Sequence, residues 1–154
     1  MLKTVLAFAA GATALLAASA ASAAPQIAGS LYQESSSATC SGSTVCQVLF
    51  TKLAPDMALR TEQVECRITV PSTVDVYSVG LNSFTQGAIG GRTFIPVVGG
   101  KSLGGPTQKT FVGQVDSAAF FAGSQPLVTM YTSVATNVSA TCTIAGTRKY
   151  ISQW

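Results

Sequence analysis

The 154-residue sequence contains no histidine. This absence excludes Ser-His-Asp and Cys-His arrangements for nucleophilic catalysis, and it excludes metal sites that need imidazole ligands. Charge is also scarce: 10% of the residues are charged, and nine Lys and Arg against six Asp and Glu leave a formal net charge of +3. Because this charge is weak and scattered, it does not predict binding to nucleic acid or to an anionic membrane surface.

The few carboxylates are expected to be solvated surface charges, since acidic side chains are mostly exposed in folded proteins. Glu62 and Glu65 are three residues apart, which would place them on opposite faces of a regular strand. The sequence also lacks the acidic loop of an EF-hand calcium site. We therefore expect no catalytic residue, no metal ligand and no cofactor. The six carboxylate residues of the sequence are Glu34, Asp56, Glu62, Glu65, Asp75 and Asp116.

The N-terminus has the pattern of a secretory signal peptide. Lys3 supplies a positive charge, Val5–Leu16 is apolar, and Ala21-Ser22-Ala23 is a small-residue cleavage site. Cleavage after Ala23 would leave residues 24–154 as a single domain, secreted or periplasmic. No later stretch is long and apolar enough to span a bilayer, so no membrane span is expected in the mature chain.

The four cysteines predict two disulfides, because an even number of cysteines in an exported chain favours pairing. Three connectivities are possible. We expect Cys40–Cys46, which are close in sequence, and Cys66–Cys142, which lie in similar alternating segments. A zinc site is the alternative, but the chain has no C-x-x-C pair and no histidine to complete one.

Two segments alternate strictly between apolar and polar residues, as half-buried strands do. In Gln63–Val70 one face carries Val64, Cys66, Ile68 and Val70. In Val138–Ile144 the equivalent face carries Val138, Ala140, Cys142 and Ile144. Each face holds one cysteine, so the two segments are predicted to be strands joined through the core.

The rest of the chain predicts further short strands separated by Gly, Pro, Ser and Asn. Glu34–Ser43 is expected to be a Ser/Thr-rich loop, and Pro96 should confine its strand to a sheet edge. With eight or nine strands and no helical period, the predicted fold is an all-β antiparallel sandwich, jelly-roll-like. The other expected strands are Gln26–Gln33, Val45–Leu53, Val74–Leu81, Thr93–Val98, Lys109–Asp116 and Leu127–Val134, before a last segment Arg148–Trp154.

These features favour a small exported protein without enzymatic activity that acts as a binding or surface/structural domain. A carbohydrate-binding module is the first alternative, with Tyr77, Tyr131 and Trp154 as stacking residues. A histidine-free, glycan-active enzyme using two of Asp75, Asp116 and Glu65 is the second. The partners considered are a glycan or another exported protein, and nucleic acid is not expected. The phenylalanines Phe94, Phe111, Phe120 and Phe121 are expected in the core.

Overall fold

The computed structural model describes residues 21–85, 88–101 and 107–154, and these residues are almost entirely β-strand. The predicted all-β class is confirmed, and every strand pair is antiparallel. The elements are β1 (Ala21–Ser22), β2 (Gln26–Ala28), β3 (Leu31–Leu49), β4 (Met57–Pro71), β5 (Val76–Thr85), β6 (Ala88–Phe94), β7 (Val97–Lys101), β8 (Gln108–Ala122), β9 (Gln125–Tyr150) and the short 3-10 helix η1 (Ile151–Gln153).

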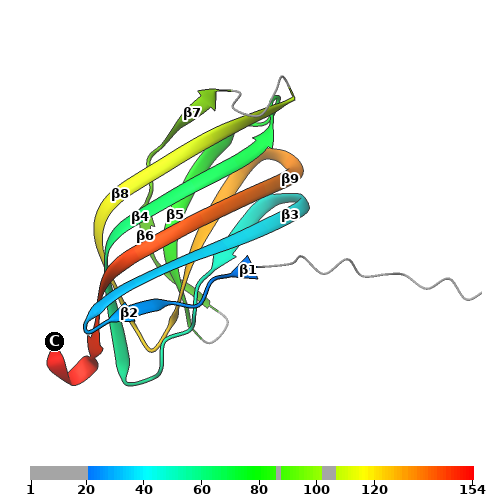
Figure 1. Ribbon diagram of the computed structural model, residues 1–154. Helices are drawn as coiled ribbons and strands as arrows, with labels where there is room; N and C mark the ends of the chain where they lie inside the picture. Colours follow the sequence, from blue (N-terminus) through cyan, green and yellow to red (C-terminus); the bar gives the residue numbers. More distant parts are fainter. Residues whose placement is uncertain (1–20, 86–87, 102–106) are drawn as a thin grey trace, which may run out of the picture.

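Hydrogen bonds join the nine described strands into one sheet, so the two separate sheets of a sandwich are not confirmed. The main order is β1-β3-β9-β4-β8-β7, with β2 beside β3, β5 beside β9 and β6 beside β5. Both β3 and β9 double back near their middles, which Figure 1 shows as two bends at the same end of the molecule. The first half of β3 pairs with the second half of β9, and the remaining halves pair with each other. The sheet therefore folds over itself at these two bends.

The predicted loop Glu34–Ser43 is wrong, because this segment belongs to β3. Its side chains alternate between the core and solvent, and Ser36 and Ala38 are buried. On the outer face hydroxyls pair across to β9, with Ser35 Oγ 2.7 Å from Thr143 Oγ1 and Ser37 Oγ 2.8 Å from Thr141 Oγ1. Cross-strand hydroxyl pairs of this kind stabilise a strand that lacks large apolar residues.

Both predicted disulfides are confirmed, Cys40–Cys46 and Cys66–Cys142. Cys66 and Cys142 are directly opposed on the neighbouring strands β4 and β9, with their Cα atoms 4.1 Å apart. Both side chains are 0% exposed. The two strands were expected to be joined across the core. The disulfide instead links two strands that are neighbours in the sheet, on its inner face.

An irregularity in β4 sets the geometry of the end where β9 finishes. The register shifts between Thr61 and Gln63 against both neighbouring strands. Gly146 lies opposite Thr61, and a Cβ atom there would overlap the carbonyl oxygen of Arg60. The extra residue at this bulge interrupts the alternation of inward and outward side chains along β4. Glu62 and Glu65 are therefore both exposed, and the expectation that they lie on opposite faces of the strand is wrong.

Other predicted strands are found with changed boundaries. Gln26–Gln33 is divided between β2 and β3 by a turn at Gly29, whose φ of 61° suits glycine. Thr93–Val98 is interrupted at Pro96, which lies between β6 and β7, and β7 is at the end of the main strand order. In the last segment β9 continues to Tyr150 before η1.

The predicted leader lies mostly outside the described residues. Its last residues pair with β3 through Ala21↔Ser37 and Ser22↔Ser36, and the Ala23 backbone N–H donates to the Ser35 carbonyl at 3.1 Å. Cleavage after Ala23 stays a prediction. Within the part of the chain that is described, no helix has the length and apolar character needed to cross a membrane.

Candidate functional site

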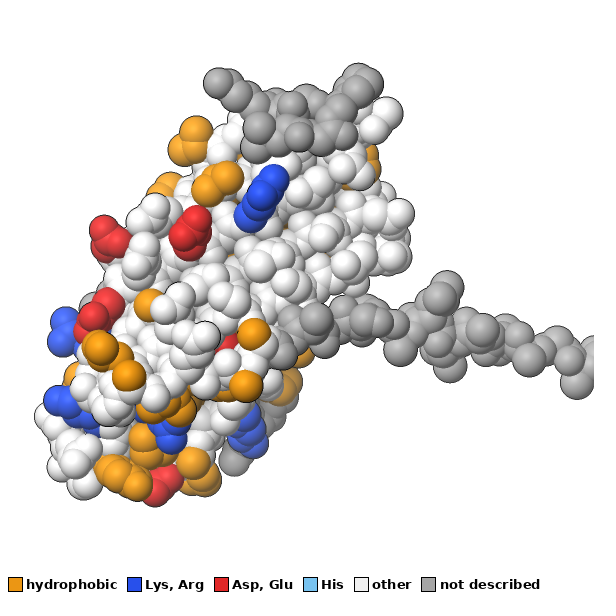
Figure 2. All heavy atoms as spheres, in the orientation of Figure 1, with side chains coloured by type: hydrophobic (Ala, Val, Ile, Leu, Met, Phe, Trp, Pro, Cys, Tyr) orange, Lys and Arg blue, Asp and Glu red, His pale blue; other side chains and the backbone are white. Residues whose placement is uncertain are grey.

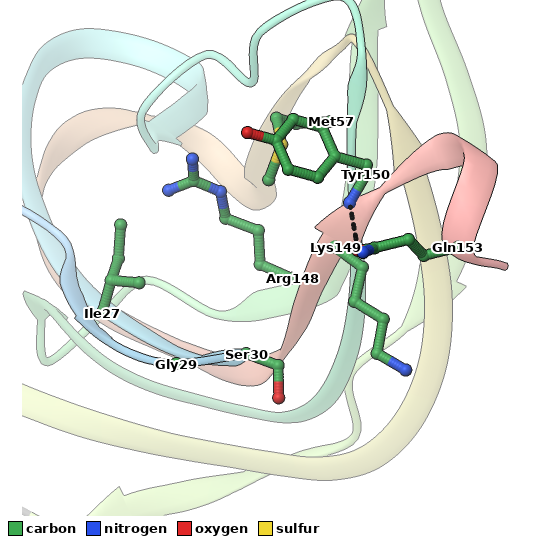
Figure 3. A pocket seen from close by; sticks show the side chains of 8 residues that line it. All are labelled: Ile27, Gly29, Ser30, Met57, Arg148, Lys149, Tyr150 and Gln153. Carbon is green, nitrogen blue, oxygen red and sulfur yellow. Dashed lines mark hydrogen bonds between the residues drawn. The ribbon is translucent and has the colours of Figure 1, made fainter.

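A cavity of about 530 Å³ opens at the end of the molecule where β2, the start of β4 and the end of β9 meet. Its apolar wall comes from Ile27, Met57 and Tyr150. Its polar wall includes Arg148 and Lys149, two consecutive residues of β9. Figure 3 shows these side chains around the opening, with the Tyr150 ring close to Met57. The site is thus built by strand ends that are far apart in the sequence.

Arg148 is placed in the cavity by the alternation of β9. It has the same parity as the buried residues Cys142 and Ile144, so its side chain points inward rather than to the outer face. Its backbone N–H donates to the Ser30 carbonyl at 2.7 Å, which holds the strand against the β2–β3 turn. Figure 3 shows the side chain extending between Ile27 and Met57. Its Nε is buried and has no hydrogen-bond partner among the described residues.

A buried acid lies behind this end of the sheet. Glu34 is 1% exposed, so its predicted surface position is wrong. The Tyr32 hydroxyl donates to Oε2 of Glu34, and the Thr51 backbone N–H and hydroxyl both donate to Oε1 at 2.9 Å. Because a buried carboxylate must have its oxygens satisfied, these donors explain how β3 can keep Glu34 inside. The sequence did not predict a buried Glu34, because its segment was expected to be a loop. In a strand, Glu34 shares the inward-facing side with Tyr32 and Ser36.

The pKa of the Tyr32 hydroxyl is raised far above its ordinary value of 10.0. Burial is the main cause, and the hydrogen bond to Glu34 and the charge of Glu34 add to it, while the positive charge of Arg148 acts in the opposite direction. Tyr32 therefore stays protonated and keeps donating to Glu34 well beyond neutral pH.

We expect this phenol to make the protein lose stability at alkaline pH. Since the pKa of Tyr32 is higher folded than unfolded, its contribution is complete below pH 10.0, the ordinary value, and is lost as the pH rises above it. Urea unfolding at a series of pH values from 8 to 12 would measure the loss. The Tyr32→Phe variant should show a smaller decline above pH 10. An equal decline in both proteins would contradict the assignment.

Exposed aromatic and apolar side chains follow the cavity residue Lys149 along the chain. Tyr150, Ile151 and Trp154 are 53%, 43% and 46% exposed. The ring of Trp154 meets the edge of Phe120 with centroids 5.4 Å apart, and Lys149 Nζ lies 5.3 Å from the Trp154 ring centroid. Figure 2 shows apolar, basic and acidic side chains gathered at this end, whereas much of the remaining visible face is uncharged. Exposed apolar groups beside a cavity are typical of a binding surface.

The predicted stacking residues do not form one surface. Tyr77 and Tyr131 lie together, with ring centroids 6.1 Å apart and planes tilted by 34°. Trp154 instead packs against Phe120 and lies beside Lys149, a residue of the cavity wall. The expectation that all four phenylalanines are in the core is wrong for Phe94 and Phe120, which are exposed, and holds for Phe111 and Phe121.

The carboxylates considered for catalysis lie on exposed positions. Asp75 forms an ion pair with Lys109. Glu65 lies opposite Gln114, and Asp116 lies opposite Gln63, so Glu65 and Asp116 are diagonal neighbours on the outer face of β4 and β8. Among the described residues there is no group of three or more acidic or cysteine side chains arranged to hold a metal ion. A hollow of about 120 Å³ lies beside Glu65.

Comparisons with protein-family models, with curated proteins and with solved structures found no match.

Proposed function

We propose that this protein is an exported, non-enzymatic binding protein that takes a small molecule into its end cavity. Export is supported by the leader pattern and by the two disulfides, which are typical of oxidising compartments. The absence of histidine from the sequence removes the commonest general base and supports binding over catalysis.

The observation that carries the proposal is the composition of the cavity wall. Its volume of about 530 Å³ falls within the usual range for small-molecule sites. Such sites combine apolar walls with a few converging polar groups, and here Met57, Ile27 and Tyr150 face Arg148. Contact with these apolar side chains would remove a ligand's apolar surface from water, which is the main source of affinity for such ligands.

A larger side chain that fills part of the cavity is expected to weaken the binding of a neutral apolar dye. N-phenyl-1-naphthylamine should gain fluorescence with the wild-type protein, because the apolar wall shields it from water. Ile27→Trp should reduce the affinity for the dye at least about tenfold, since the indole ring of the introduced tryptophan occupies space beside Arg148. Ile27 is half exposed, so the fold should accept the change.

The matched control is Val134→Trp, at an exposed position in the bend of β9 away from the cavity. This variant should bind the dye as the wild type does. A wild-type protein that leaves the dye fluorescence unchanged, or equal binding by both variants, would refute the proposed site.

A carbohydrate-binding role is the second candidate. It is supported by the Tyr77–Tyr131 pair, of which Tyr77 is 66% exposed. Amphipathic rings of this kind can stack against sugar rings. Trp154 does not contribute to this candidate, because its ring packs against Phe120 and not against the tyrosine pair.

A further inference from the structure

We infer that the ligand of the end cavity is an organic anion, with a carboxylate-type group at Arg148 and an apolar body against Met57 and Ile27. This inference rests on the proposed function, since it names the chemical class that the same cavity would take.

The first support is the unsatisfied donor of Arg148. Its Nε lies out of contact with water and has no acceptor among the described residues. A buried donor without an acceptor destabilises a protein, so such groups normally mark a missing partner. Nε and a terminal guanidinium nitrogen form a fork that matches the two oxygens of a carboxylate. Because Nε is already buried by the protein's own atoms, a ligand carboxylate reaches it only when neighbouring side chains shift, and it would then accept both hydrogen bonds.

The second support is the sign of the charge around the cavity. Arg148 and Lys149 are both in its wall, and none of the described residues that line it is acidic. The nearby acid Glu34 already accepts hydrogen bonds from Tyr32 and Thr51. Glu34 does not accept a hydrogen bond from Nε of Arg148. The Arg148 guanidinium faces this partly enclosed space and favours an anion there, whereas the Lys149 ammonium lies beside the Trp154 ring (Figure 3).

The third support is the apolar surface that continues from Arg148 toward the mouth. Met57 is buried at the back of this surface and Ile27 lies across from it. Tyr150 belongs to the same wall. An anion with an apolar chain or ring would use both kinds of wall, whereas a small inorganic anion would use only one.

Octanoate, 1-octanol and octylamine test this inference, because they share one chain and differ in the head group. Each is titrated against the complex of the protein with N-phenyl-1-naphthylamine, and dye displacement gives the affinity. Octanoate should bind at least about tenfold more tightly than octanol, as charge-assisted hydrogen bonds to a buried donor allow. Octylamine should be the weakest of the three, because Arg148 repels it.

The variants Arg148→Gln and Lys149→Gln separate the two cations. Arg148→Gln should bring octanoate to the affinity of octanol, and Lys149→Gln should retain most of the preference, because Lys149 already contacts the Trp154 ring. Circular dichroism of each variant shows whether it is folded. If Arg148→Gln does not fold, the head-group comparison in the wild type decides alone.

The outcomes distinguish the two proposals. Dye binding with equal affinity for octanoate and octanol would overturn the anion inference and leave the binding cavity intact. An unchanged preference in folded Arg148→Gln would also overturn it. If neither the dye nor any octyl compound binds, the proposed function and the inference fail together.

Discussion

Replacing Cys66 and Cys142 together with alanine is expected to lower the free energy of unfolding by about 4 kcal/mol. The disulfide closes a long loop, with a sequence separation of 76, so its loss gives the unfolded chain much more conformational freedom. Both cysteines are fully buried in the core, and the smaller alanine side chains would add a packing loss in the same direction.

The disulfide between Cys40 and Cys46 provides the matched comparison. Its sequence separation is 6, so the Cys40→Ala, Cys46→Ala variant should lose only about 2 kcal/mol. Urea unfolding of both double variants at neutral pH measures the difference. Equal losses in the two variants would show that loop length does not govern the contribution of these bonds.

The Glu34→Ala variant is expected to lose roughly 3 kcal/mol of unfolding free energy. Alanine removes the acceptor for the Tyr32 hydroxyl and for the Thr51 backbone N–H. Tyr32 is 3% exposed, so water cannot readily replace the lost partner of its hydroxyl. Leaving buried donors unsatisfied costs more than a hydrogen bond contributes.

A double-mutant cycle with Tyr32→Phe tests this explanation. If the unpaired hydroxyl causes much of the loss, then adding Tyr32→Phe to Glu34→Ala should cost less than Tyr32→Phe alone costs in the wild type. Glu65→Ala is the control, because Glu65 is exposed, and it should change stability by no more than about 0.5 kcal/mol. Strict additivity of the two substitutions would contradict the proposed coupling.

The sequence predicts the centre of the fold better than its margins. Where large apolar residues alternate, as around Cys66 and Cys142, both the strands and their disulfide are found as expected. The Ser-rich half of β3 carries no such pattern, because its pairing depends on hydroxyls that β9 supplies from more than 100 residues away. The doubling back of β3 and β9 is likewise a property of two strands together, which a local pattern does not encode.

The candidate site was harder to predict because none of its residues forms a motif. Arg148, Met57 and Ile27 are brought together only where three strand ends converge. One signal was available in the sequence: Arg148 has the same parity as Cys142 and Ile144, so a strand continuing past Ile144 would carry a cation to the inner face. Glu34 could have been found in the same way once its segment was recognised as a strand.

The bends of β3 and β9 make the unfolding of the two parts of the sheet cooperative. Each of these strands supplies hydrogen-bond partners on both sides of its bend, so neither part of the folded-over sheet has a complete set of its own strands. Neither part can therefore melt while the other remains native, and slow-exchanging amides before and after the bends should share one opening free energy. A fragment cut at either bend would lack half of its partners and should not fold in isolation.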